Sequence, residues 1–237
     1  MSEFSAEARP TTGLFSSENR QIKLLRGLWS AALDLLYPPR CGVCNRIDTH
    51  LCPRCTAIIA EYGEPIERDL PENLTASYAT ALHEGGVRSV VLALKEDRHE
   101  SLVAALGERL LFTFNQLKWP ISCIVPVPLH SSRLHERGYN QSALLAGYLG
   151  KKLAYPVYTE AIIRVRDTQH QVGLSGDERR MNVQKAFQAN PTLIADHAVL
   201  LIDDVFTTGA TLQACAEAVL KAGAAQAFGL TVTAADV

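Results

Sequence analysis

The sequence of 237 residues lacks a long apolar run, and its formal net charge is only -2. The one mainly apolar segment, 22–37, is shorter than a bilayer span and contains Lys23, Arg26 and Asp34. Residues 1–20 are polar, so we expect no signal peptide and no membrane insertion. A net charge this small gives no overall attraction to nucleic acid or to a membrane surface. A cytoplasmic protein is the expectation.

The sequence also lacks internal repeats and low-complexity tracts. Its hydrophobic fraction of 47% is enough to build a globular core. We expect a disordered tail over 1–21 and a helix with a cysteine module over 22–62. A polar linker with Pro65 and Pro71 then leads to an α/β domain over 76–237.

Within that domain, apolar residues at helical spacing alternate with short β-branched runs, which is typical of a parallel sheet flanked by helices. The spacing predicts helices over 87–94, 102–114, 142–153 and 212–221, and strands over 121–127, 198–202 and 228–233.

The segment 199–211 is the strongest functional signal. Four apolar residues precede Asp203 and Asp204, and parallel sheets bind ligands at the carboxyl ends of their strands. The following residues, Thr207, Thr208, Gly209, Ala210 and Thr211, are rich in hydroxyl groups and open a helix, so their amides and hydroxyls suit a phosphate. The two carboxylates suit ribose hydroxyls, directly or through Mg²⁺. The alternative is a threonine-capped helix with two aspartates in a turn. The segment is not a Walker loop, because no Gly-Lys-Ser/Thr is present.

This segment resembles the phosphoribosyl pyrophosphate (PRPP) motif of type I phosphoribosyltransferases at each of its thirteen positions. Further matches lie at Leu94-Lys95, 37–41, 125–130 and 137–142, and at Arg164, Arg166, Thr168, Gln171, Leu174, Arg179, Asn182, Val183, Ala186 and Phe187. With these matches the sequence resembles the ComF family, also called GntX-like, over about residues 25 to 235. The resemblance implies a type I phosphoribosyltransferase-like sheet behind an N-terminal zinc module, and an association with competence or DNA uptake.

The resemblance also implies roles for single residues. Arg137 is the best-placed cation of a pyrophosphate loop, ahead of Arg133 and His135. The segment 164–182 matches the mobile hood that closes over the ligand in type I enzymes, with Arg166, Gln171 and Arg179 as contacts. The candidate catalytic residues are therefore Asp203, Asp204, Arg137 and Arg166. For each single residue a scaffolding role is an equal alternative: Arg179-Arg180 as a solvated helix face, Asn140-Gln141 as a helix cap, and Lys95 as a surface lysine.

Four of the six cysteines form two Cys-x-x-Cys pairs, Cys41 with Cys44 and Cys52 with Cys55. Two such pairs complete a tetrahedral, structural Zn²⁺ site with no open position. The alternative, a redox pair, leaves the second Cys-x-x-Cys unexplained. His50 is not needed as a ligand, and we expect Cys123 and Cys215 in the core.

Three functional hypotheses follow. The domain is an enzyme that transfers the ribosyl group of PRPP, or it binds PRPP or a similar sugar phosphate without catalysis. In the third, Arg40, Arg46 and Arg54 on the cysteine module contact nucleic acid. The family resemblance implies single-stranded DNA or a helicase-like ATPase of the competence machinery as partners.

Overall fold

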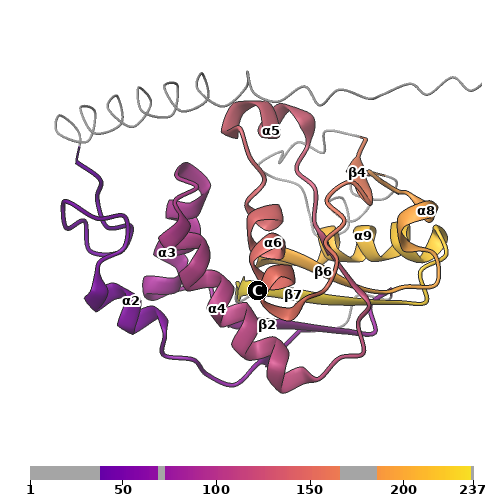
Figure 1. Ribbon diagram of the computed structural model, residues 1–237, viewed down its shortest axis with the longest axis horizontal. Helices are drawn as coiled ribbons and strands as arrows, with labels where there is room; N and C mark the ends of the chain where they lie inside the picture. The colour runs from indigo at the N-terminus through magenta and orange to yellow at the C-terminus, as the bar shows by residue number, and fades with distance from the viewer. Residues whose placement is uncertain (1–37, 69–72, 166–185, 236–237) are drawn as a thin grey trace, which may run out of the picture.

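A five-stranded sheet with the order β1-β2-β7-β6-β3 forms the centre of the molecule (Figure 1). The computed structural model describes residues 38–68, 73–165 and 186–235. Strands β2, β7, β6 and β3 run parallel, and β1 is antiparallel to β2. The sheet strands are β1 (Ile66–Glu67), β2 (Ala76–Leu82), β3 (Cys123–Pro126), β6 (Ala198–Phe206) and β7 (Gln226–Ala234). The α/β class with a largely parallel sheet is confirmed.

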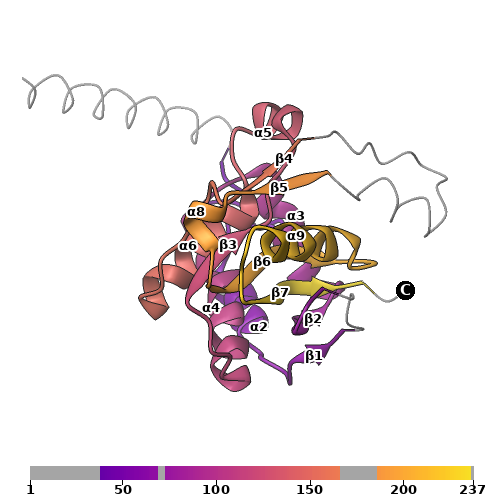
Figure 2. The same ribbon diagram turned by 90° about the vertical axis from the view of Figure 1, so that its right-hand side faces the viewer.

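Helices cover both faces of this sheet (Figure 2). On one face lie α3 (Gly85–Glu96), α4 (Glu100–Leu117) and α6 (Gln141–Leu153), and on the other lies α9 (Ala210–Lys221). Shorter helices are α2 (Pro53–Ile59), α5 (Ser131–Arg137) and α8 (Pro191–Ile194). A separate pair of antiparallel strands, β4 (Ile162–Arg164) and β5 (Phe187–Ala189), packs against α9. The four helices expected from the apolar spacing are confirmed, each with its ends shifted by up to three residues.

Strand β6 is central because its apolar residues face both layers of helices. Leu200 and Ile202 belong to the core under α3, α4 and α6, and Val199 and Leu201 belong to the core under α9. The sequence predicted that the strand ends at Ile202, but it continues through the two aspartates to Phe206. It does so because Asp203 and Val205 still pair with Thr231 and Thr233 of β7. The aspartates therefore belong to the last part of the paired strand and not to a loop.

The cysteine module and the α/β domain share one hydrophobic core. Cys41, Cys52 and Cys55 are buried in the same cluster as Leu94 of α3 and Leu106 of α4. The expected linker contains strand β1, which adds to the edge of the main sheet. The module is therefore packed directly on the domain.

Arg109 of α4 lies buried between the cysteine module and the domain, with 3% of its surface exposed, and connects the two by hydrogen bonds. Its guanidinium donates to the backbone oxygen of Ile59, the last residue of α2, at 2.5 Å and to that of Glu61 at 3.0 Å. It also donates to the backbone oxygen and hydroxyl of Thr80 on β2, at 3.1 and 3.2 Å. These four acceptors are neutral oxygens, so Arg109 here crosslinks backbone segments.

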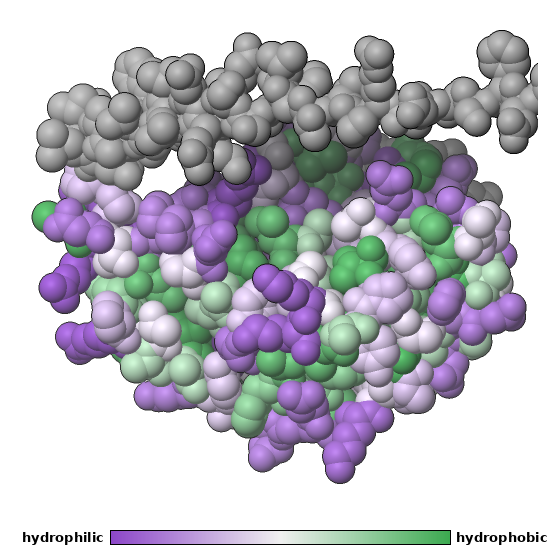
Figure 3. All heavy atoms as spheres, viewed as in Figure 1, coloured by the Kyte–Doolittle hydropathy of each residue, from purple (hydrophilic) through white to green (hydrophobic). Residues whose placement is uncertain are grey.

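Large apolar side chains that reach the surface are scattered over several elements. They include Ile47 and Ile58 in the module, Leu92 and Phe112 on α3 and α4, and Ile163 and Val165 near β4. The face in Figure 3 accordingly shows apolar side chains interrupted by hydrophilic ones. Among the helices in the described ranges, none has the length and apolar character needed to cross a bilayer.

The expected tail over 1–21, the helix over 22–37 and the hood residues Arg166, Gln171 and Arg179 lie outside the described residues.

Candidate functional site

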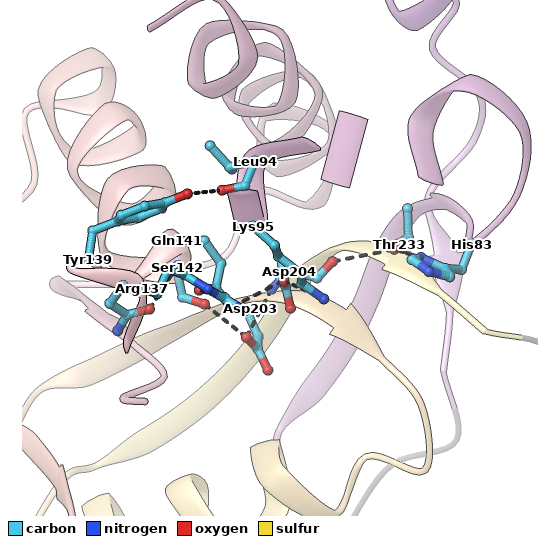
Figure 4. A network of polar contacts seen from close by, with 11 residues as sticks. His83, Leu94, Lys95, Arg137, Tyr139, Gln141, Ser142, Asp203, Asp204 and Thr233 are labelled. Atoms are coloured by element: carbon cyan, nitrogen blue, oxygen red, sulfur yellow. Dashed lines mark hydrogen bonds and ion pairs between the residues drawn. The ribbon is translucent and has the colours of Figure 1, made fainter. Parts of the chain in front are cut away.

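Asp203 and Asp204 lie at the carboxyl end of β6, and the start of α6 contacts both of them (Figure 4). The Oδ1 atom of Asp203 accepts hydrogen bonds from the Ser142 hydroxyl and from the backbone amide of Asp204, both at 2.9 Å. The second carboxyl oxygen has no protein donor among the residues described. Asp203 therefore keeps one oxygen available at the edge of the sheet.

Asp204 is more deeply buried, with 6% of its surface exposed. Its Oδ2 atom lies 3.0 Å from the Lys95 ammonium on α3 and accepts a hydrogen bond of 3.2 Å from the Gln141 side chain on α6. The oxygen of the Gln141 amide in turn accepts from Arg137 at the end of α5, at 2.6 Å. Two cations on different helices are thus connected to one carboxylate.

The surroundings of Asp203 disfavour its charged form. Burial, and then the neighbouring charge of Asp204, raise the pKa of Asp203 to about 7. The hydrogen bonds from Ser142 and from the Asp204 amide, and the charge of Lys95, act in the opposite direction. The Asp203 carboxyl group therefore titrates near neutral pH. A bound cation would favour its ionised form.

His83, directly after β2, joins the same network from the other side. Its Nδ1 atom lies 2.8 Å from the Thr233 hydroxyl, which donates to the backbone oxygen of Asp204 at 3.4 Å. Burial, and then the charges of Lys95 and Arg88, lower the pKa of His83, so its imidazole is neutral at pH 7. His83 and Thr233 could not be identified from sequence patterns, because only the pairing of β2 with β7 brings them together beside β6.

The hydroxyl-rich loop follows the acid pair and leads into α9. Thr207 and Thr208 are exposed, and Gly209 caps the helix with φ of 74°, a conformation that glycine adopts without a Cβ clash. Gln213 donates to the Gly209 oxygen at 2.9 Å. The structure gives no acceptor within the described ranges for the amides of Ala210 and Thr211. Because the first turn of α9 has no acidic side chain, this helix start suits an anion.

The segment after β3 carries both scaffolding and site residues. Asn140 caps α6 by accepting from the Ser142 amide at 3.0 Å, and it donates to Val127 at 2.9 Å. This supports the scaffolding role for Asn140, and it aims the next two residues, Gln141 and Ser142, at the acid pair. For Gln141 the structure favours the site role over the capping role, and Ser142, the last residue of the 137–142 motif, was not singled out from the sequence. His135 is exposed on α5 and Arg133 is half-buried there, and no contact connects either of them to the acid pair.

The four cysteines of the two Cys-x-x-Cys pairs meet at one point. Their sulfur atoms all lie within 4.8 Å of one another, and those of Cys44 and Cys52 are 3.7 Å apart. Zinc–sulfur bonds of about 2.3 Å in a tetrahedron place the sulfurs about 3.8 Å apart. The cluster could therefore hold a zinc ion, with three buried ligands and the exposed Cys44.

Backbone hydrogen bonds in the module favour the thiolate form of Cys41, the form that binds a cation. Burial raises the pKa of Cys41, but hydrogen bonds from backbone amides around it, including that of Cys52, outweigh burial and lower the pKa to about 6. His50 contacts Asp97 at 2.5 Å and stacks on His99 instead of joining the cluster. Cys123 and Cys215 are buried core residues, as expected.

Fold and site together define a class of protein. It is an α/β protein joined to a four-cysteine module, with an acid pair and a helix start that suits an anion at one edge of its sheet. The DNA utilization protein YhgH of Escherichia coli O157:H7 is 32% identical over 195 residues, covering 78% of this chain and 86% of that protein. Competence protein F of Haemophilus influenzae is 40% identical over 111 residues, 46% of this chain and 48% of that protein. Competence protein ComFC of Bacillus subtilis is 31% identical over 102 residues, 43% of this chain and 40% of that protein. The chain belongs to the competence-related ComF/GntX family.

No family model matches the chain. Similar solved structures include glutamine PRPP amidotransferase from B. subtilis, with a TM-score of 0.37 and 17% identity over 53% of this chain and 25% of that chain. Another is adenine phosphoribosyltransferase from Trypanosoma brucei, with a TM-score of 0.37 and 12% identity over 73% of this chain and 87% of that chain.

Proposed function

We propose that this chain binds PRPP or a related sugar phosphate at the carboxyl end of β6. One observation carries the proposal: the acid pair at the carboxyl end of β6 contacts Lys95 directly and Arg137 through Gln141, and the loop that follows the pair leads to the start of α9, where the amides of Ala210 and Thr211 have no acceptor among the described residues. PRPP needs an anion site for its 5′-phosphate, then oxygens that accept hydrogen bonds from its ribose hydroxyls, and then positive charge for its pyrophosphate.

Each group has a distinct task in the proposal. Thr207 to Thr211 bind the 5′-phosphate through amides and hydroxyls. Asp203 and Asp204 accept hydrogen bonds from the ribose hydroxyls and supply the oxygen ligands that Mg²⁺ prefers. Bound Mg²⁺ would neutralise charge on the pyrophosphate. Arg137, with Arg166 from outside the described residues, stabilises the negative charge that grows on departing pyrophosphate.

Transfer of the ribosyl group requires an acceptor nucleophile in addition to this site. A non-catalytic sensor would use the same contacts without turnover. The two functions differ in whether pyrophosphate is released in the presence of an acceptor base.

We place the chain in the use or uptake of DNA, since the relatives are named for DNA utilization and competence. Its six cysteines are all free thiols in the structure. A reducing compartment keeps such thiols available for metal, so we propose a cytoplasmic location.

Calorimetric titration with PRPP and Mg²⁺ tests the binding. Asp203→Ala combined with Asp204→Ala should abolish binding while the protein stays folded. Asp196→Asn is the matched control, since Asp196 is exposed at φ of 62° near the opposite end of β6 and asparagine tolerates that conformation. Unchanged affinity in the double variant would refute the ribose contacts. A second assay with a panel of bases then distinguishes the enzyme, which releases pyrophosphate, from the sensor.

A second candidate function is contact with single-stranded DNA through the module. Arg40, Arg46 and Arg54 are all exposed there, which favours it. Changing the three to Ala should weaken binding and reduce the slope of log affinity against log salt by about 2, the value for three phosphate contacts on a single strand. Arg88→Ala, on the exposed side of α3, is the control. An unchanged slope would exclude the module as the contact surface.

A further inference from the structure

Helix α3 touches the cysteine module along one side and the acid pair at its end. Ala93 faces Gly42 of the module, and two residues later Lys95 reaches Asp204 (Figure 4 shows the latter contact). Between them, the backbone oxygen of Leu94 accepts a hydrogen bond of 2.7 Å from the Tyr139 hydroxyl. The last turn of α3 is therefore held by the module on one side and by Tyr139 on another.

The contact between the module and α3 leaves no free space. A Cβ atom placed on Gly42 would lie 2.5 Å from the Cβ of Ala93, closer than such atoms approach in proteins, so only glycine fits there. The next nearest atoms, the Cα of Ala93 and the backbone oxygen of His50, are both at 4.0 Å. His50 also pairs with Asp97, the residue that ends α3. Any shift of the module is thus transmitted to the end of α3.

Lys95 is sensitive to such a shift. It projects from the last turn of α3 and its side chain is 26% exposed, so a shift of that turn changes the distance between its ammonium and Asp204. At 3.0 Å the contact is a charge-assisted hydrogen bond, and it is lost when the separation exceeds about 3.5 Å.

We propose that the cysteine module positions Lys95 on Asp204 and thereby sets the affinity of the acid pair for its ligand. Lys95 is then a binding residue of the site, and Gly42 and Ala93 are positioning residues that act through it. The inference rests on the proposed function for the identity of the ligand, but the coupling between the module and Lys95 can be measured without one.

The first experiment changes the contact and leaves all four thiols intact. Gly42→Ala forces the module and α3 apart, and we expect a several-fold loss of PRPP affinity with unchanged zinc content. Adding Ala93→Gly removes the clashing Cβ, so that the nearest atom of residue 93 would be its Cα at 4.0 Å, and affinity should recover. Ala93→Gly alone is the control for the lower helix propensity of glycine. Asp97→Asn removes the negative charge that faces His50, so a smaller loss is expected there even if Gly42→Ala does not fold.

A double-mutant cycle identifies the route of the effect. Lys95→Met should lower PRPP affinity by a similar factor, and Gly42→Ala should cause no further loss in the Lys95→Met background. Additive losses would overturn the proposal, as would full affinity in both Gly42→Ala and Asp97→Asn.

A ligand-free cycle separates this inference from the proposed function. The coupling between Lys95→Met and Asp204→Asn, measured by urea unfolding, should fall toward zero in the Gly42→Ala background. A coupling unchanged by Gly42→Ala would overturn the inference. If instead the coupling falls but the wild-type chain does not bind PRPP, the positioning of Lys95 holds and the proposed ligand is wrong.

Discussion

Asp203 and Asp204 are neighbours in sequence, yet the fold gives their carboxyl groups different surroundings. Asp204 contacts the Lys95 ammonium and the Gln141 amide. Asp203 accepts from a hydroxyl and an amide and contacts no cation directly among the residues that the structure describes. A strand places consecutive side chains on opposite faces, so one carboxyl group faces the helices that carry the cations and the other faces α9. Asp203 is therefore the carboxyl group that gains most from a bound cation.

The raised pKa of Asp203 predicts a cost to stability that depends on pH. Its pKa is about 7 in the folded protein against 3.8 for an ordinary aspartate, so the folded state holds the proton more tightly than the unfolded state. The contribution of Asp203 to the free energy of unfolding is therefore most favourable when the carboxyl group is protonated in both states. It falls as the pH rises from about 4 to about 7. Asparagine at this position has no such cost. Asp203→Asn should be more stable than the wild type at pH 8 by an amount on the order of 1 kcal/mol, because Asp203 is partly exposed, and the gain should be smaller at pH 5.

Urea unfolding at the two pH values measures this difference, with Asp196→Asn as the exposed control. The same gain at pH 5 and pH 8 would contradict the assignment of the titrating group to Asp203.

At the scale of elements, the site depends on the passage from β6 through a short loop into α9. The strand holds the acids rigidly because its pairing with β7 continues past them. The chain must then change direction to start α9, and Gly209 makes this turn at φ of 74°. An L-residue with a Cβ adopts this conformation at a cost of about 1 kcal/mol.

Gly209→Ala should therefore disturb the loop more than the rest of the fold. We expect PRPP affinity to fall about tenfold, because the amides of Ala210 and Thr211 lose their common direction, and the unfolding free energy to fall by about 1 kcal/mol. Gly147→Ala on the exposed side of α6 is the control, since a Cβ there meets no atom within 4 Å. Calorimetry and thermal unfolding measure both effects, and full affinity in Gly209→Ala would show that the loop does not bind the phosphate.

At the scale of the whole molecule, the cysteine module and the α/β domain share one core. The buried cysteines pack in one cluster with residues of α3 and α4, and Arg109 fastens the end of α2 to β2. A module of this size cannot stabilise itself by burial, so bound metal would contribute directly to its folding. Loss of that metal should consequently weaken the domain as well.

Removal of the zinc tests whether the module and the domain depend on each other for stability. We expect about one zinc per chain by elemental analysis, and Cys44→Ser should lower both the zinc content and the unfolding temperature of the whole chain. Cys44 is the exposed member of the cluster, so its change to serine disturbs packing least. Cys123→Ala, in β3, should keep the zinc. A metal-free chain that unfolds at the same temperature as the zinc-bound chain would refute a structural role.

The sequence by itself determined four helices, three strands and the local motifs, but not strands β1, β2, β4 and β5. The apolar spacing identified α3, α4, α6 and α9, and the run 199–211 identified a strand, an acid pair and a helix start, because both signals are contained within a few consecutive residues. The two Cys-x-x-Cys pairs likewise indicated a four-thiolate cluster, since their spacing alone brings the sulfurs together.

Only the tertiary structure decided which distant residues complete the site. Lys95, Gln141 and Ser142 reach the aspartates, and His83 meets Thr233, because the strand order β2-β7-β6-β3 brings their elements to one edge of the sheet. The contact of Gly42 with Ala93 was equally hidden, since a glycine required by close approach looks in sequence like any loop glycine. Contacts between residues far apart in the chain depend on how helices and strands pack, and that packing follows from the whole core rather than from any local pattern.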